Sequence, residues 1–184
     1  CRSSSAQHIS ALPTSGAGLQ HSSEAYDIRM SDNVIQPVLG KGVYIAPTAY
    51  VGGDVTFGDE CSVWHQVMIR GDVSAIRLGR RVNVQDGTII HTRKGVPLEI
   101  EDEVAIGHRA VVHCRRVGTG ALIGVGSIVL DDAEVGEGAI VGAAALVPPG
   151  HVVPPGKVVV GTPARVLRDV TDQDRAYIAR VIAT

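Results

Sequence analysis

A six-residue repeat of aliphatic residues constrains the fold of this 184-residue chain more than any other feature. The period matches neither the 3.6 residues of a helix nor the strict alternation of sandwich strands. It predicts an all-β solenoid, a parallel β-helix in which three hexapeptides make one triangular coil. The repeated residues are Ile45, Val51, Phe57, Val63, Ile69; Leu78, Val84, Ile90; Ile100, Ile106, Val112; and Val117, Ile123, Val129, Val135, Val141, Val147, Val153.

The composition agrees with a narrow solenoid and excludes several functional classes. Aromatic residues make up only 3% of the chain, as expected where the interior admits aliphatic side chains but few rings. A net charge of −2 gives no reason to expect a nucleic acid as partner, and no apolar run is long enough to span a membrane. The three cysteines form no paired framework, which favours a reducing compartment and a cytoplasmic location.

The chain divides into three segments. Residues 1–29 are rich in Ser, Ala and Gly and lack the repeat, so we expect an extension, a tag or a targeting remnant. A mitochondrial location is the alternative if they are a transit remnant. Residues 30–166 form the predicted β-helix, and residues 167–184 the C-terminal helix, for which Thr171 is the expected N-cap and Asp174 part of a capping box.

The repeat fixes where three histidines lie. His91 and His113 each follow the inward residue of the same face on successive coils, so they should stack about 5 Å apart. Arg70 occupies the same column one coil earlier. His108 belongs to the adjacent face, where it should stack above Asp86.

Two stacked imidazoles can share a metal ion, and a tetrahedral zinc site needs a third protein ligand and one open position. A neighbouring copy of the chain could supply that third ligand through His108. The alternative is three unrelated surface histidines. Iron and cobalt are also possible, because imidazole binds all three metals. Cys114 should leave its strand on the side opposite to His113, so we expect a buried or surface thiol rather than a ligand.

A set of motifs resembles the γ-class carbonic anhydrase family over about residues 36–180. The resemblance implies a left-handed β-helix with a C-terminal helix, a homotrimer, and metal sites between subunits. It also implies that His91 and His113 come from one subunit and His108 from the next. The motifs are Arg70-Gly71-Asp72, Asn83-Val84-Gln85-Asp86, His91, Ile106-Gly107-His108, Val112-His113 and Gly161-Thr162-Pro163-Ala164-Arg165.

The resemblance further assigns roles and an activity, the reversible hydration of carbon dioxide to bicarbonate by a metal-bound hydroxide. Arg70 and Asp72 resemble residues that form salt bridges across the trimer interface. Gln85 resembles the residue that hydrogen-bonds the metal-bound water. Because the family's proton-shuttle glutamate is missing here, Asp86 and His65 are the candidates for a substitute group that carries the proton away; the alternative for His65 is an inert surface residue.

Two departures from the most active members leave the turnover rate open. Val73 stands where they carry a glutamate, and the loop after His91 is short and basic. Two other functions therefore stay in consideration. One is a hexapeptide acyltransferase that uses acyl-CoA and needs a single histidine as base. The other is a catalytically weak assembly or structural subunit. Three histidines exceed what an acyltransferase needs. Metal analysis would discriminate between a carbonic anhydrase and an acyltransferase.

Overall fold

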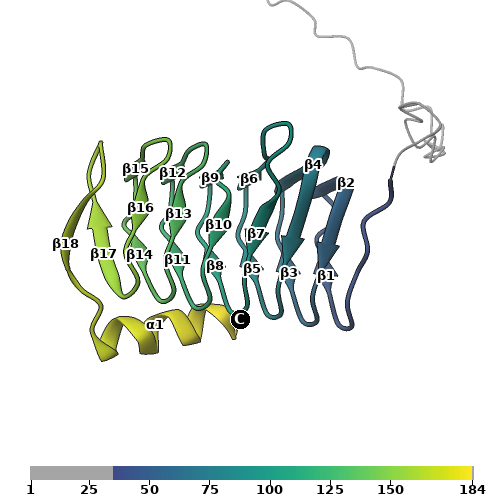
Figure 1. Ribbon diagram of the computed structural model, residues 1–184. Coiled ribbons are helices and arrows are strands. Elements are labelled where there is room, and N and C mark those ends of the chain that lie inside the picture. The colour runs from purple at the N-terminus through teal and green to yellow at the C-terminus, as the bar shows by residue number, and fades with distance from the viewer. Residues whose placement is uncertain (1–34, 184) are drawn as a thin grey trace, which may run out of the picture. The chain divides into compact units, whose positions relative to one another are not determined.

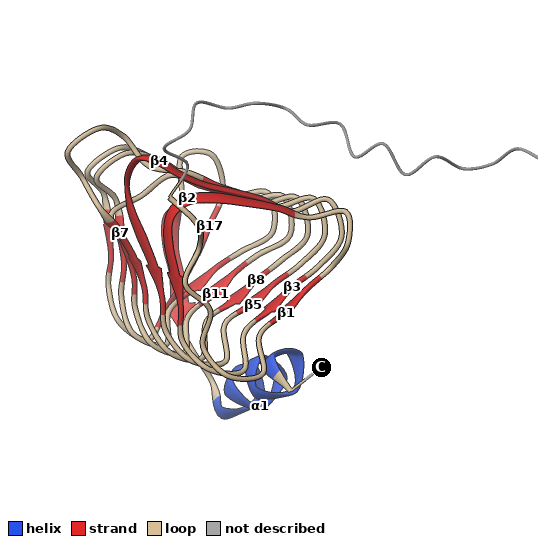
Figure 2. Cartoon of the chain, turned by 90° about the vertical axis from the view of Figure 1, so that its right-hand side faces the viewer, coloured by secondary structure: helices blue, strands red, loops and turns tan. Residues whose placement is uncertain are grey.

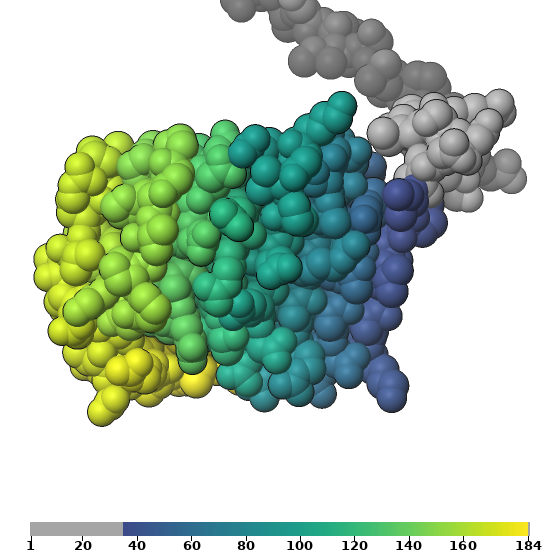
Figure 3. All heavy atoms as spheres, in the orientation of Figure 1, coloured from purple at the N-terminus to yellow at the C-terminus, as the bar shows by residue number. Residues whose placement is uncertain are grey.

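The computed structural model describes residues 35–183, so the predicted extension 1–29 lies outside the described residues. The described chain winds into a left-handed parallel β-helix followed by a helix, which confirms the predicted fold class. The coil is triangular in cross-section (Figure 2) and its turns stack along one direction (Figure 1). Figure 3 shows the successive coils as adjacent bands of colour.

One face of the coil consists of short parallel strands in coil order, with the C-terminal helix lying along it. We call it the helix face. Its strands are β1 (Tyr44–Ile45), β3 (Ser62–Val63), β5 (Asn83–Val84), β8 (Ala105–Ile106), β11 (Leu122–Ile123), β14 (Ile140–Val141) and β17 (Lys157–Val160).

The other two faces share two long strands, which continue across a corner: β2 (Tyr50–Phe57) and β4 (Met68–Leu78). The start of β4 pairs with β6 on the second face, and its end pairs with β7 on the third. The second face continues through β6 (Ile89–Ile90), β9 (Val111–Val112), β12 (Ile128–Val129) and β15 (Leu146–Val147). The third continues through β7 (Leu98–Ile100), β10 (Arg116–Val117), β13 (Glu134–Val135) and β16 (Val152–Val153).

The hexapeptide residues point into the coil, as predicted. On the second face Ile69 pairs with Ile90, and Ile90 with Val112, and all three are fully buried. β-Branched side chains suit such strands, and each buried aliphatic side chain stabilises the fold by about 1.5–3 kcal/mol. A slip of one residue would turn this whole column outward. The same burial therefore fixes the direction of the residues that follow.

The outward side chains differ between the second and third faces. On the second they form an apolar column, so we call it the apolar face. Among them Tyr50, Met68 and Ile89 are exposed. The column consists of Tyr50, Met68, Ile89, Val111, Ile128 and Leu146. On the third face, the charged face, the column alternates in sign through Arg77, Glu99, Arg116 and Glu134. A charged column suits contact with water, whereas an exposed apolar column marks an interaction surface.

The C-terminal segment differs from the prediction at its start. After the last coil, β18 (Arg165–Asp169) turns back antiparallel to β17. The predicted boundary at residue 167 therefore falls inside a strand. Sequence reasoning missed β18 because the hexapeptide period ends with the coils and nothing marks the reversal of direction.

Helix α1 (Asp172–Ile182) follows, with Thr171 as its N-cap and Asp174 completing the capping box, as predicted. Ile178 is the buried residue of α1, and it packs against Ile140 and Val158 of the helix face. The helix thus covers its own solenoid. Within residues 35–183 no helix is long and apolar enough to cross a membrane.

Candidate metal centre

His91 and His113 stack at the corner where the apolar face meets the charged face. They directly follow β6 and β9, which pair in parallel register. Their ring centroids lie 5.2 Å apart and their planes are inclined by 39°. The side chains are partly exposed, His91 by 20% and His113 by 26%. The stacked pair predicted from the register is confirmed.

A line of polar contacts runs through the two rings. Asp131 Oδ1 lies 2.7 Å from His113 Nδ1, and Asp72 Oδ1 lies 3.0 Å from His91 Nε2. The two remaining nitrogens, His113 Nε2 and His91 Nδ1, are 3.1 Å apart. An ionised carboxylate only accepts hydrogen bonds, so each aspartate takes the N–H of its ring. In two neutral imidazoles the facing nitrogens then both carry lone pairs, and a cation between them would relieve their repulsion.

The Arg70-Gly71-Asp72 motif supplies one of these carboxylates. Arg70 Nη1 lies 3.0 Å from Asp72 Oδ2, so this pair forms within the chain. Burial raises the pKa of the Asp72 carboxyl, but the hydrogen bond from His91 and the charge of Arg70 bring that pKa below its ordinary value. A Cβ on Gly71 would lie 2.5 Å from the Asp54 carbonyl oxygen. Only glycine therefore lets the neighbouring strand approach so closely.

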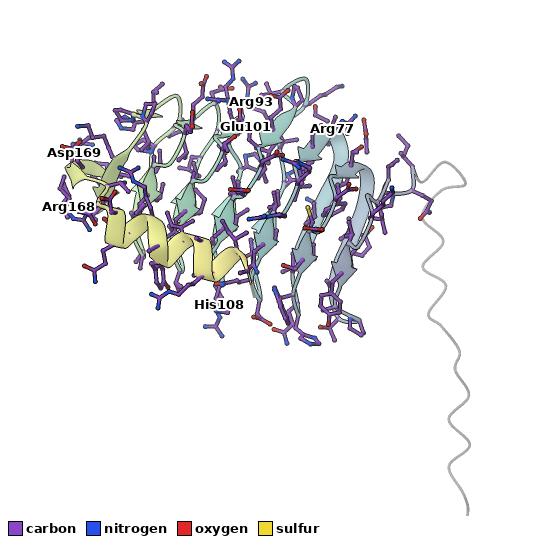
Figure 4. The ribbon with its side chains drawn as sticks, turned by 90° about the horizontal axis from the view of Figure 1, so that it is seen from below. Arg77, Arg93, Glu101, His108, Arg168 and Asp169 are labelled. Carbon is purple, nitrogen blue, oxygen red and sulfur yellow. The ribbon has the colours of Figure 1, made fainter. Side chains whose placement is uncertain are left out.

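His108 lies at the opposite corner of the apolar face, between β8 and β9. Its Nδ1 is 3.0 Å from Asp86 Oδ2, as expected from the predicted stacking, and 51% of its side chain is exposed. Figure 4 shows His108 and Arg93, which follows His91 by two residues, at opposite edges of the solenoid. In the described part of the chain, no three His, Cys, Asp or Glu side chains converge as a metal site. One chain therefore brings together two of the three predicted ligands.

The remaining predicted residues lie near the His108 corner. Gln85 is half-buried, and its backbone amide donates to the Ile106 carbonyl oxygen at 2.9 Å. His65 is exposed, with its Nδ1 2.9 Å from Thr48 Oγ1. The Gly87 amide donates to the His65 carbonyl, which places His65 one coil below Asp86, in the predicted column.

Cys114 points into the coil, which decides between the buried and the surface thiol that the sequence left open. It is 1% exposed, and burial raises the pKa of its thiol to about 12. Its Sγ lies 3.7 Å from the Arg116 carbonyl oxygen. A thiol that is both buried and protonated is no partner for a metal held by His113.

Sequence reasoning missed the corner at Asp131 and Asp132, where Asp131 contacts the histidine pair and Asp132 lies outside the site. Asp131 binds His113, whereas Asp132 accepts two hydrogen bonds from Arg93 Nη2, at 2.9 and 2.8 Å. That second contact fastens the basic loop after His91 beside the histidine pair. The hexapeptide period gave no signal for this contact, because Val112 pairs with Val129 and the coil spans 17 residues here, one fewer than the 18 between His113 and Asp131.

Fold and site together define a hexapeptide-repeat protein whose histidines are held by carboxylates at two corners of one face. No family model matches the chain. It is 50% identical over 137 residues to a probable carbonic anhydrase of Methanocaldococcus jannaschii, covering 74% of this chain and 86% of that one. It is 38% identical over 150 residues to the mitochondrial gamma carbonic anhydrase 2 of Arabidopsis thaliana, covering 78% of this chain and 54% of that one. The chain belongs to the γ-class carbonic anhydrase family.

A solved structure gives the same fold under another description. The putative acetyltransferase of Bacillus cereus superposes with a TM-score of 0.78 at 43% identity, covering 80% of this chain and 86% of that one. The likeness supports the left-handed hexapeptide fold.

Proposed function

We propose that the chain forms a homotrimer that reversibly hydrates carbon dioxide to bicarbonate at three zinc sites between subunits. Each site takes His91 and His113 from one subunit and His108 from the next. The observation that carries the proposal is the 3.1 Å approach of His113 Nε2 to His91 Nδ1, with the outer nitrogen of each ring held by an aspartate. The names of the relatives support carbon dioxide as the substrate.

The residues present fit a zinc ion. Zinc–nitrogen bonds of 2.0–2.1 Å in a tetrahedral site place two ligand nitrogens about 3.3–3.4 Å apart, close to the distance found here. Each predicted ligand also has a carboxylate partner, and such partners orient ligating imidazoles. The pairs are His91 with Asp72, His113 with Asp131 and His108 with Asp86. The donor set suits iron and cobalt as well.

Three neutral imidazoles would leave the charge of a bound zinc ion uncompensated, and the chemistry that the ion would supply is a water acidic enough to lose its proton near pH 7. The chain's own part is to hold and orient. The three aspartates fix the rings, and the Gln85 amide, next to Asp86, hydrogen-bonds the reacting water. The proton leaves through Asp86 or His65, both of which reach solvent from the same column.

The apolar face supports the assembly. It is flanked by His108 at one corner and by the His91–His113 pair at the other. When the His108 corner of one subunit meets the paired corner of the next, the contact is head-to-tail, and such contacts close into rings. The same contact would cover the exposed parts of Met68 and Ile89, which are 43% and 45% exposed.

Acyl transfer is the second candidate, because one feature favours it. His108 has its Nδ1 on Asp86 and an exposed ring, the arrangement of a general base oriented by a carboxylate. An acyltransferase mechanism, however, gives no role to the facing nitrogens of His91 and His113. A structural subunit without activity would likewise need neither the pair nor its two aspartates.

The test is metal analysis and a carbon dioxide hydration assay on the same sample, purified without oxygen. We expect about one metal ion per subunit, hydration activity that a chelator removes, and its return with added zinc, iron or cobalt. Protein that carries no stoichiometric metal and transfers acyl groups from acyl-CoA would overturn the proposal in favour of the second candidate.

A further inference from the structure

We propose that Asp131 is a positioning residue that sets the tautomer of His113. By accepting Nδ1–H, it leaves the lone pair on Nε2, the nitrogen that faces His91. The part of this inference that concerns metal affinity rests on the function proposed above. The tautomer itself is a property of the metal-free chain, so it can be measured whether or not the proposed function is correct.

The contact between Asp131 and His113 is the shortest of the three histidine–carboxylate contacts. It measures 2.7 Å, against 3.0 Å for both His91 with Asp72 and His108 with Asp86. This is the range of hydrogen bonds to an ionised partner. His113 is 26% exposed, compared with 51% for His108, so water competes less for its ring nitrogens.

The backbone holds both partners in place. The His113 amide donates to the Val129 carbonyl at 2.9 Å, and the Gly150 amide donates to the Asp131 carbonyl at 2.8 Å. The two side chains therefore project from adjacent coils whose separation is fixed by strand pairing. A contact built on such a frame is pre-organised, because neither partner has to move before the ring can bind a ligand.

Among the charged groups at this corner, His113 is the one whose side chain contacts the Asp131 carboxylate. The charge of Arg93 also acts on Asp131, but its guanidinium makes its hydrogen bonds and its ion pair with the Asp132 carboxylate. Asp72, by comparison, divides its two oxygens between His91 and Arg70. Within residues 35–183, Asp131 has no ion pair other than the one with His113.

Loss of the carboxylate would change which nitrogen carries the proton. A neutral imidazole has one N–H, and the hydrogen bond at one nitrogen decides the state of the other. Without Asp131, His113 can place its proton on Nε2 and present a donor toward His91. That tautomer cannot bind a cation at Nε2, so affinity falls even though every ligand is still present.

Asp131→Asn and Asp132→Asn form a matched pair for the test. Each replaces one of two neighbouring carboxylates, of similar exposure (43% and 42%), by an amide of the same shape. We expect Asp131→Asn to weaken zinc binding about 10–100-fold in competition with a chelator. Asp132→Asn, which loses only the contact with Arg93, should stay within about two-fold of wild type. Equal affinities in the two variants would overturn the inference.

The second measurement is the nitrogen-15 NMR spectrum of the histidine rings in the metal-free protein at about pH 8.5, where an ordinary imidazole is neutral. We expect His113 to carry its proton on Nδ1 in wild type and in Asp132→Asn, and partly on Nε2 in Asp131→Asn. Wild-type protein with the proton on Nε2 would contradict the inference, even if the variants failed to fold.

The two proposals fail in distinguishable ways. If His91→Ala and His108→Ala lose zinc but Asp131→Asn binds it like wild type, the metal site stands and the role of Asp131 is wrong. If those histidine variants keep zinc, the proposed function is wrong, and the NMR measurement alone decides the role of Asp131.

Discussion

His91 Nδ1 lies 3.1 Å from His113 Nε2 on the next coil. Twenty-two residues separate the two side chains along the chain, yet strand pairing between β6 and β9 sets their spacing. The buried column beneath them keeps both rings on the same outer edge. The solenoid thus converts a repeat in the sequence into a pair of facing nitrogens.

Each of His91→Ala, His108→Ala and His113→Ala should lose bound metal, because each removes one of three proposed ligands. We expect metal content to fall at least about ten-fold in every variant, together with carbon dioxide hydration. Elemental analysis of the purified proteins gives the content per subunit. His65→Ala, which removes an exposed imidazole outside the ligand set, is the control and should keep its metal. Full metal content in any of the first three variants would remove that residue from the set.

Ile89→Asp should break the proposed trimer, because it places a charge in the middle of the apolar face. Val152→Asp is the matched control: Val152 is equally apolar and even more exposed, at 58% against 45%, but belongs to the charged face. Light scattering after size exclusion should give a monomer mass for Ile89→Asp and a trimer mass for Val152→Asp. Trimers in both variants would show that the apolar face is not the contact.

Cys114→Ala should leave metal content unchanged and cost about 1 kcal/mol of unfolding free energy, the usual loss for a small change in a packed core. The raised pKa of this thiol, about 12, keeps it protonated at pH 8. Iodoacetamide should therefore fail to label Cys114 in native protein and label it after unfolding, as peptide mass spectrometry would show. Rapid labelling of the native protein would place the thiol at the surface.

The docking of α1 should depend on pH through Asp174. The hydrogen bond from Arg168, followed by those from Thr171, lowers the pKa of Asp174 below its ordinary value. A carboxyl with a lowered folded pKa stabilises the fold above its unfolded pKa of about 3.9, and this contribution is lost as pH falls through the folded value.

Hydrogen exchange of the α1 amides, compared between wild type and Asp174→Asn, would test this. The variant should be less protected than wild type at about pH 6, and the difference should shrink toward pH 2. Asp172→Asn removes a carboxylate of the same helical turn that makes no capping contact and only an exposed ion pair with Arg175, so it should stay close to wild type at both pH values. A difference that persists unchanged at low pH would assign the effect to something other than this carboxyl.

The sequence predicted the positions of residues that lie directly beside a buried residue of the repeat, because that buried residue fixes the direction of their side chains. His91 and His113 stack because Ile90 and Val112 are buried directly before them. Asp86 lies below His108 for the same reason. For Cys114 the repeat predicted only the side of the strand opposite to His113, and the structure shows that this side is buried. The capping box of α1 was equally predictable, since Thr171 and Asp174 satisfy backbone groups within one turn.

What escaped prediction depends on contacts that the period does not encode. Asp131 contacts His113 from a corner of the coil. The register is offset there, because Val112 pairs with Val129 at a spacing of 17 residues rather than 18. The strand β18 reverses direction after the repeat has ended. The partner of His108, the identity of the metal and the cellular compartment stay predictions, because they depend on molecules other than this chain.

Subunit mixing tests the shared site most directly. His91→Ala and His108→Ala subunits, unfolded and refolded together in equal amounts, should regain about a quarter of wild-type metal and activity, because one interface in four joins an intact pair to an intact His108. His91→Ala mixed with His113→Ala should regain nothing, since every subunit then carries a broken pair. Recovery in the first mixture alone is the predicted result. No recovery in the first mixture, or recovery in the second, would contradict a site built from two subunits in this way.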